Sequence, residues 1–148
     1  MKLKIKYLDN YLPSWGKITK AHDSDAGFDL RAAIPSKLLI MPSSYVKIPL
    51  GIATEFDTGY EAQLRARSGL AAKFGIGLVN GVGTVDAGYR GEWAVILYNY
   101  SMDVFCINPG DRVCQVVFNQ LPSVDIEEGP LTNDDNRFGG FGSTGVAS

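Results

Sequence analysis

Hydrophobic and polar side chains alternate along several short runs of this chain. Over residues 2–8, Leu3, Ile5 and Tyr7 alternate with three lysines, and residues 28–33 alternate in the same way. A period of two is typical of a β-strand that buries one face. Further strand-like runs, separated by Gly, Pro, Ser and Asp, lie at residues 38–41, 45–50, 52–56, 60–67, 93–99 and 112–119. Many short strands with turn signals between them predict an all-β sandwich or barrel.

Residues 68–75 are the one good helix candidate. Ser68 is a suitable N-cap, the following Leu-Ala-Ala-Lys favours a helix, and Gly75 is a suitable C-terminal stop. Arg67 directly precedes this helix, and an arginine beside the free N–H groups of a helix start favours anion binding. A capped helix beside an ordinary surface arginine is the alternative interpretation.

Residues 80–93 are rich in glycine and hold one amide, Asn80, one carboxylate, Asp86, and one tyrosine, Tyr89. Glycine allows the backbone to approach a ligand closely and to adopt turn angles. With the apolar run that follows, this stretch predicts a β-hairpin whose mouth binds a flat ligand, with Asp86 beside it. The alternative is that Asp86 is a plain turn residue that bonds its own backbone.

Asp29 and Gln115 are further candidates for binding. Asp29 shares the polar face of its run with Arg31, where a lone carboxylate either binds Mg²⁺ through water or is simply solvated. Gln115 shares a face with Val113 and Val117, so its amide needs either a backbone partner or a ligand.

Composition limits the possible partners. The chain has 148 residues, a size suited to a single domain, with 45% hydrophobic residues and a net charge of −2. No global basic field exists to hold nucleic acid or an anionic membrane. The N-terminus lacks the apolar core of a signal peptide, and no apolar run reaches membrane-spanning length, so a cytoplasmic location is expected. Cys106 and Cys114 are expected to be buried reduced thiols, and the only histidine, His22, is expected to have no role.

The C-terminal tail carries a glycine-rich segment. Residues 140–145 spell G-x-G-x-x-G, but only three residues follow, whereas a dinucleotide site needs a helix there. A disordered terminus is one interpretation. The other is a mobile arm whose amides, with Arg137, Ser143 and Thr144, wrap a phosphate while a phenylalanine stacks on a base. Taken together, the candidates suit a nucleotide with several phosphates.

These residues resemble a known family, the homotrimeric all-β dUTPases, over essentially the full length of the chain. The family's five motifs are similar to residues 26–32, 67–70, 80–92, 110–115 and the glycine-rich tail, in that order. The resemblance implies a distorted jelly-roll-like barrel or sandwich of many short strands with one short helix. It also implies a single dUTPase domain over residues 1–148, with a mobile C-terminal arm at about 132–148. Arg137 departs from the family pattern, because only Phe138 separates it from the Gly-Gly pair that follows.

The resemblance implies Mg²⁺-assisted hydrolysis of dUTP to dUMP and pyrophosphate, which supplies the precursor of dTMP and keeps uracil out of DNA. Asp86 would orient and deprotonate the water that attacks the α-phosphorus, and Asp29 would hold metal-bound water. Tyr89 would lie against the deoxyribose, and Phe141 would stack on uracil. The resemblance assigns substrate binding to Arg67, Ser68, Gly69, Asn80, Gly83, Tyr89, Gln115, Arg137, Phe141, Gly142, Ser143 and Thr144. It also implies a homotrimer whose active sites are shared between subunits, the arm crossing to a neighbour.

Three alternatives stand beside this interpretation. The related dCTP deaminases share the fold and use a glutamate near the third motif, where Glu92 lies. A non-catalytic nucleotide sensor on the same scaffold is the second, although Asp29 and Asp86 are both present. A β-sandwich interaction module with coincidental glycines is the third. The pattern of Tyr89 and Phe141 favours dUTP hydrolysis.

Overall fold

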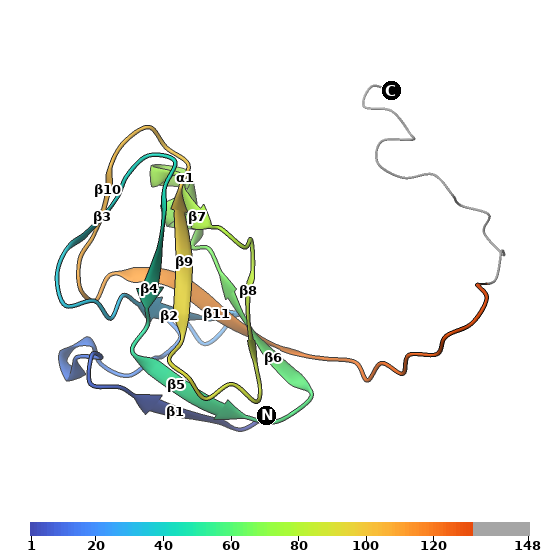
Figure 1. Cartoon of the computed structure of the whole chain (residues 1–148). Coiled ribbons are helices and arrows are strands. Elements are labelled where there is room, and N and C mark those ends of the chain that lie inside the picture. The colour runs from blue at the N-terminus through green and yellow to red at the C-terminus, as the bar shows by residue number, and fades with distance from the viewer. Residues whose placement is uncertain (132–148) are drawn as a thin grey trace.

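The computed structural model describes residues 1–131, which form short β-strands with one short α-helix and one 3-10 turn (Figure 1). The strands are β1 Leu3–Tyr7, β2 Phe28–Arg31, β3 Leu38–Ile40, β4 Tyr45–Pro49, β5 Ile52–Phe56, β6 Tyr60–Arg65, β7 Ile76–Leu78, β8 Gly83–Asp86, β9 Ala94–Asn99, β10 Phe105–Ile107 and β11 Arg112–Gln120. The helix α1 spans Ser68–Phe74, and the 3-10 turn η1 spans Pro13–Trp15. The predicted all-β class is therefore confirmed. The predicted arm at about 132–148 lies outside the described residues.

The described strands pair in four antiparallel sheets. The largest has the order β2-β11-β6-β8, and the next has the order β4-β9-β7. Two pairs complete the arrangement: β1-β5, at the bottom of the view in Figure 1, and β3-β10, at the upper left. Each larger sheet has one face turned inward, and the hydrophobic core lies between these faces.

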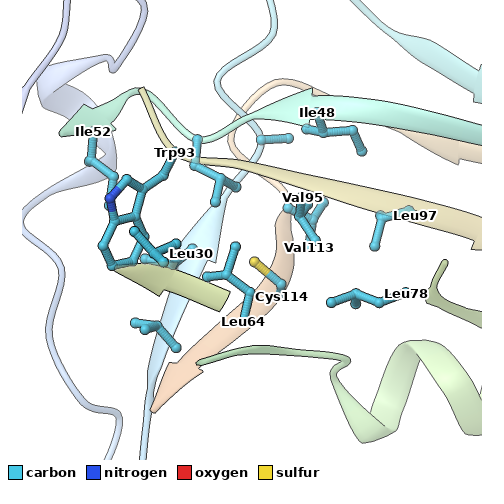
Figure 2. Close-up of a cluster of buried hydrophobic side chains, with 14 of the residues drawn as sticks. Leu30, Ile48, Ile52, Leu64, Leu78, Trp93, Val95, Leu97, Val113 and Cys114 are labelled. Atoms are coloured by element: carbon cyan, nitrogen blue, oxygen red, sulfur yellow. The ribbon is translucent and has the colours of Figure 1, made fainter. Parts of the chain in front are cut away.

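The core follows the alternation that the sequence shows. In β6, Ala62 and Leu64 are buried while their neighbours are half-buried, and in β9 Val95 and Leu97 are buried in the same way. Trp93, only 1% exposed, is the largest side chain among them. Figure 2 shows side chains of several strands directed into this shared space. Each fully buried side chain of this size contributes roughly 1.5–3 kcal/mol through removal of apolar surface from water.

The helix begins one residue earlier than the capping pattern predicts. Arg67, not Ser68, is the N-cap: its backbone is still extended, and its carbonyl oxygen accepts hydrogen bonds from the N–H groups of Leu70 and Ala71. The prediction of Ser68 as the cap is wrong because the end of β6 carries the extended conformation through Arg67. Gly75 ends the helix with a φ of +65°, a conformation that favours glycine, so the predicted stop is confirmed.

Residues 80–93 do not form the predicted hairpin. Within the described residues, β8 pairs with β6, and the strand that follows it, β9, pairs with β4 and β7. The segment thus crosses from one sheet to the other. The reason is burial: Gly83 and Val85 face the core from β8, and the Trp93 backbone is tied to Ile52 and Leu50 on the opposite side.

A β-bulge interrupts β11, and it changes which residues share a face. Arg112 pairs with Arg31 and Cys114 with the next residue, Leu30, so Val113 is an extra residue. Val113 and Cys114 are both buried. The prediction that Val113 lies on the same face as Gln115 is therefore wrong.

The two cysteines are free and differ in burial. Cys114 is completely buried, as predicted, whereas Cys106 is only half-buried, against the prediction. In residues 1–131, no helix is both long enough and apolar enough to cross a membrane.

Candidate active site

Gly27 lets residues 26–32, the first of the five motifs, lie close to β11. A side chain at this position would place its Cβ only 2.7 Å from the carbonyl oxygen of Val116, so only glycine lets the two strands approach this closely. The pairing that results puts Asp29 directly opposite Gln115. Cross-strand partners have their side chains on the same face of a sheet, so these two lie next to each other.

The bulge in β11 adds an arginine to this face. Arg112 and Gln115 are three residues apart, and in a regular strand they would point to opposite faces. The extra residue restores the alternation, so that Arg112 and Gln115 both lie on the face of Asp29. Arg112 could not be predicted as a member of the site, because no local sequence pattern indicates the bulge.

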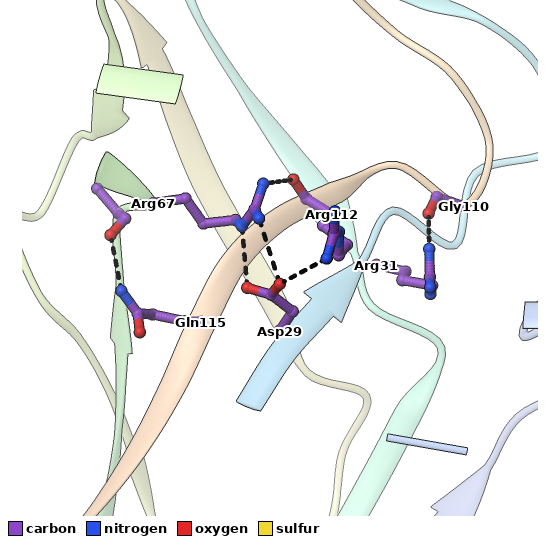
Figure 3. A network of polar contacts seen from close by, with 7 residues as sticks. Asp29, Arg31, Arg67, Gly110, Arg112 and Gln115 are labelled. Carbon is purple, nitrogen blue, oxygen red and sulfur yellow. Dashed lines mark hydrogen bonds and ion pairs between the residues drawn. The ribbon is translucent and has the colours of Figure 1, made fainter. Parts of the chain in front are cut away.

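Asp29 holds two arginines together. Its Oδ1 accepts a hydrogen bond from Arg67 Nε at 2.9 Å, and its Oδ2 accepts from Arg67 Nη2 at 3.2 Å and from Arg112 Nη1 at 3.3 Å (Figure 3). The Arg67 and Asp29 side chains are about one quarter exposed. Arg67 also donates to the backbone carbonyl of Arg112. We name Asp29, Arg67 and Arg112 the arginine cluster; it carries one net positive charge.

Gln115 borders the arginine cluster. Of the two partners that the sequence left open for its amide, a backbone group or a ligand, the structure shows a backbone group. Its Nε2 donates to the carbonyl oxygen of Ala66 at 3.3 Å, and its Oε1 lies beside Gly27. Ser68 and Gly69 follow Arg67 and are exposed. As the first residues of α1, their N–H groups have no partner within the helix, so they are available to a ligand.

A tight turn presents Asp86 at the other end of the sheet. The N–H of Tyr89 donates to the carbonyl of Asp86 at 3.0 Å. Arg90 secures this turn, because its Nη1 donates to the carbonyl oxygens of Ala87 at 2.5 Å, Tyr89 at 3.1 Å and Thr54 at 3.4 Å. The turn that the sequence offered as the plain alternative thus exists, and its bonds come from the backbone of Asp86 and leave the carboxylate free.

Glu92 connects the segment that carries Asp86 and Tyr89 to other parts of the chain through hydrogen bonds. Its Oε1 accepts from Asn10 Nδ2 at 2.7 Å and from the N–H of Gly51 at 3.0 Å. The hydroxyl of Tyr89 donates to the Glu92 carbonyl at 3.1 Å, and the tyrosine ring covers Gly91 so closely that a side chain there would collide with it. Because its carboxylate bonds the protein itself, Glu92 is poorly suited to the catalytic role that the deaminase alternative requires.

Asp86 opens into a hollow of about 230 Å³. The hollow is lined by Lys47, Thr84, Val85, Asp86, Tyr89, Glu92, Trp93 and Ala94. Asp86 is exposed, and its carboxylate forms no hydrogen bond or ion pair with any other part of residues 1–131. At the start of β8, a Cβ on Gly83 would lie 3.4 Å from Asn80 Nδ2, so the predicted amide and glycine lie side by side.

The predicted site residues therefore form two groups on one sheet face. Asp86 lies opposite Glu61, and Gln115 lies opposite Arg65, both partners being on β6. Four residues of strand separate the two positions by roughly 13 Å. The structure brings Asp29, Arg67 and Gln115 together, and Asp86 and Tyr89 together, but it keeps the two groups apart. The remaining predicted residues, Arg137, Phe141, Gly142, Ser143 and Thr144, lie outside the described residues.

Burial of the strand behind the arginine cluster has one electrostatic consequence. Cys114 is completely enclosed, and this burial raises the pKa of its thiol well above the usual range. The carboxylate of Asp29 raises it further, while Arg67 acts in the opposite direction. Cys114 is therefore an inert neutral thiol at physiological pH.

Comparisons with known proteins agree with this arrangement. The sequence model of the dUTPase family matches residues 14–145. Two curated deoxyuridine 5'-triphosphate nucleotidohydrolases, from Anaplasma marginale (strain St. Maries) and Maricaulis maris (strain MCS10), are each 45% identical to this chain, over 136 and 149 residues. These alignments cover 91% and 97% of this chain and 89% and 96% of the relatives.

Solved structures show the same fold. The dUTPase of Staphylococcus bacteriophage 80alpha with dUPNHPP superposes with a TM-score of 0.83 at 22% identity, covering 98% of this chain and 99% of that one. A mutant dUTPase from phage phi11 of S. aureus, whose structure reveals the coordination of a structural Mg(II) ion, gives a TM-score of 0.78 at 20% identity, with 90% and 100% covered. These likenesses confirm the jelly-roll-like fold. By the family match over most of its length and the identity to its curated relatives, the chain belongs to the dUTPase family.

Proposed function

We propose that this dUTP diphosphatase hydrolyses dUTP to dUMP and pyrophosphate by attack of water at the α-phosphorus, with Asp86 as the general base. The observation that carries the proposal is the exposed carboxylate of Asp86, which opens into a hollow and has no side-chain partner within residues 1–131. A positioned carboxylate can accept the proton of an attacking water. The reaction would supply dUMP for dTMP synthesis and keep uracil out of DNA.

Placement of Asp86 contributes more to this chemistry than its basicity. A carboxylate is a weak base for water, so the rate depends on holding the water in line with the phosphorus. The contacts of Arg90 and Tyr89 fix the turn on which Asp86 stands. The carboxylate itself keeps its acceptor sites for water, because its own turn uses only backbone atoms.

The arginine cluster and its neighbours suit the phosphates. Arg67 and Arg112 supply charge-assisted donors that Asp29 already holds in place. The exposed N–H groups of Ser68 and Gly69 add neutral donors beside Arg67. Donors fixed before the reaction stabilise the charge that develops on phosphate oxygens at no cost of reorganisation. In this proposal Gln115 completes the set.

Asp29 fits a role beside Mg²⁺ through water better than direct coordination. A carboxylate offers about four lone-pair sites, and three arginine N–H groups occupy three of these sites on Asp29. The site that remains can accept a hydrogen bond from a metal-bound water, while the two guanidinium charges oppose a cation in direct contact. In residues 1–131, no three carboxylate, histidine or cysteine groups cluster as a protein-built metal site. When bound, Mg²⁺ would offset the charge of the phosphates and of the leaving pyrophosphate.

The region of Asn80, Gly83 and Tyr89 suits the nucleoside. Asn80 and the backbone beside Gly83 would offer donors and acceptors to the edge of uracil and would leave no room for the methyl group of thymine. The Tyr89 ring would lie against the deoxyribose, so that a ribose hydroxyl would collide with it. The phage 80alpha dUTPase with dUPNHPP supports a nucleotide substrate for the family.

A homotrimer with shared active sites would account for the separation of the two groups. A separation of roughly 13 Å along β6 is too large for one water-mediated reaction centre that uses Asp86 and the arginine cluster of the same copy. A second copy would bring its arginine cluster to the Asp86 of the first. Phe141 and the other arm residues would close the site from a further subunit. A cytoplasmic location, without nucleic-acid or membrane partners, stays a prediction.

Pyrophosphate release from dUTP, dCTP, dTTP and UTP in parallel, with Mg²⁺ and chromatography of the products, tests the proposal. The expected result is rapid formation of dUMP from dUTP alone. Release of ammonia from dCTP would move the chain to the deaminase branch. Tight binding of dUTP without turnover of any nucleotide would support the sensor alternative instead.

A further inference from the structure

A second, smaller cavity lies beside the arginine cluster. It measures about 120 Å³ and is bounded by the segment 17–21 on one side and by β2 and β11 on the other. Its lining includes Asp29, Arg31 and Arg112. Figure 3 shows Asp29 and Arg112 between Arg67 and Arg31, so this cavity adjoins the arginine cluster on the side away from Arg67. We name it the basic groove.

The basic groove concentrates positive charge in a chain that is acidic overall. Lys17, Lys20, Arg31 and Arg112 line it, and Asp29 is the only carboxylate among its lining residues. That carboxylate is already shared by two guanidinium groups. In the described part of the chain, neither lysine forms an ion pair, and the Lys20 ammonium lies over the Phe28 ring, 5.6 Å from its centroid. The groove therefore has a surplus of three positive charges, although the whole chain has a net charge of −2.

Hydrogen bonds to the backbone hold the side chains at the base of the groove, Arg31 and Tyr11, in place. Arg31 is half-buried, and its Nη1 donates to the carbonyl oxygen of Gly110 at 2.8 Å, which leaves further N–H groups of the guanidinium to bind a ligand. Tyr11 is 7% exposed, and its hydroxyl donates to the carbonyl of Gly16 at 2.9 Å. That hydroxyl can still accept a hydrogen bond. Fixed donors beneath two long lysines favour an oxyanion over a solvated surface.

The size of the groove narrows the class of ligand. About 120 Å³ is half the volume of the hollow beside Asp86. One water molecule needs roughly 10–15 Å³, so the groove has room for a small hydrated anion. It is too small for a nucleoside triphosphate, and it has little apolar surface on which a base could stack.

We propose that the basic groove is a separate binding site for inorganic pyrophosphate, which receives this product as it leaves the arginine cluster. The assignment rests on the proposed function, because pyrophosphate is the product of that reaction. Arg112 belongs to both sites, so pyrophosphate can pass from one to the other without losing all of its charged partners. The groove would thereby clear the catalytic phosphate positions for the next substrate.

Direct titration of the full-length chain with pyrophosphate, in the absence of nucleotide, tests this site. The informative variant is the double substitution Lys17→Gln/Lys20→Gln, which removes two exposed charges from the rim. The matched control is Lys2→Gln/Lys37→Gln, which removes two exposed charges that do not line the groove. Removal of two rim charges should raise the dissociation constant of pyrophosphate about tenfold or more, whereas the control should change it less than twofold. Inorganic phosphate should bind the unaltered chain more weakly than pyrophosphate.

Kinetic inhibition by added pyrophosphate provides the second measurement. In the groove variant, the inhibition constant of pyrophosphate should rise about tenfold more than the KM for dUTP. An equal rise in both constants would place the lysines at the substrate phosphates and overturn the separate site. Equal effects of the groove and control variants, or phosphate binding as tight as pyrophosphate binding, would also overturn it. The titration needs no turnover, so it tests the groove even if the chain fails to hydrolyse dUTP.

Discussion

The two groups of site residues are held in opposite ways. In the arginine cluster, charged side chains bind one another: Asp29 accepts three N–H groups from two arginines. At the other end of the same sheet face, the Asp86 carboxylate has no partner within residues 1–131, and its position comes from backbone contacts and from Arg90. The arginine cluster is therefore held in place by hydrogen bonds between its own charged side chains. Asp86 is held in place by the backbone turn and by Arg90, and its carboxylate takes no part.

This difference matches what each end is proposed to do. A phosphate needs donors that stand ready and do not reorganise, so mutual pairing of Asp29, Arg67 and Arg112 is an advantage there. A general base needs a free acceptor site, so any side-chain partner of Asp86 would compete with the attacking water. Substitutions at the two ends should therefore fail in different ways, in binding at one and in turnover at the other.

The largest effect is expected at the free carboxylate. Asp86→Asn keeps the shape of the side chain but removes its ability to accept a proton, so kcat should fall by roughly 10²–10⁴-fold. Binding of dUTP and the melting temperature should change little, because the exposed Asp86 side chain forms no hydrogen bond or ion pair in the described chain. The measurement is kcat with calorimetry of nucleotide binding.

Glu92→Gln is the matched control for this prediction. It removes a carboxylate of the same segment, but glutamine can still accept from Asn10 and Gly51. Most of the turnover should remain. If Glu92→Gln abolished turnover while Asp86→Asn did not, the two carboxylates would have to exchange roles.

The next largest effect is expected in the arginine cluster. Arg67→Lys keeps the charge but cannot bind Asp29 with two N–H groups. The loss of charge-assisted hydrogen bonds, roughly 1.5–3 kcal/mol, should lower kcat/KM about 10–100-fold, mainly through KM. Steady-state kinetics measure the split.

Arg65→Lys serves as the control for the arginine cluster. Arg65 lies two residues away on the same face and bonds Gln63 instead of Asp29. Its effect on kcat/KM should stay within a few-fold. Equal losses for Arg65→Lys and Arg67→Lys would mean that the paired geometry around Asp29 has no special part in phosphate binding.

Much of the fold could be predicted from the sequence because the alternation of apolar residues is strong. The strands β1, β4, β5 and β6 occur where the pattern places them, and Gly75 ends the helix as expected. The failures occur where distant parts of the chain decide. Residues 80–93 look like a hairpin locally, but the core draws β8 and β9 into different sheets. Within residues 1–131, β10 pairs only with the short strand β3, which a local pattern could not show.

The site shows the same division between local and distant causes. Glycine spacing drew attention to Asp86 and Tyr89, and the faces of the strand-like runs drew attention to Asp29 and Gln115, to which the resemblance to the dUTPases then assigned roles. Arg112 was missed because its position depends on the bulge at Val113. The supporting roles of Arg90 and Glu92 were missed too, because their partners include Thr54, Asn10 and Gly51, which lie far away in the chain.

A smaller effect is expected at the support beneath Asp86. Arg90→Ala removes three hydrogen bonds to carbonyl oxygens and loosens the turn from Asp86 to Tyr89. Misplacement of the base should lower kcat by about tenfold, with a smaller change in KM. Arg90→Lys keeps one donor group and should recover part of the loss. Hydrogen exchange at the Tyr89 amide should rise in Arg90→Ala; unchanged exchange together with unchanged kcat would remove Arg90 from its positioning role.

The smallest effect on activity, and a distinct effect on stability, is expected behind the arginine cluster. Burial raises the pKa of the Cys114 thiol in the folded chain, whereas the unfolded chain has a thiol pKa of about 8.5. The stabilisation that comes from this difference is complete below about pH 8.5 and is lost as the pH rises, because only the unfolded chain then releases the proton.

The free energy of unfolding should therefore fall by up to about 1.4 kcal/mol per pH unit above about pH 8.5 from this thiol alone. Tyr11, whose pKa is also raised by burial, should add to the slope only above about pH 10. Denaturant unfolding between pH 7 and 10 measures the slope. Cys114→Ala should flatten it, whereas Cys106→Ala, at a half-buried position, should leave it in place. An equally steep slope in Cys114→Ala would show that the thiol is not the group that makes the strand behind the arginine cluster sensitive to alkali.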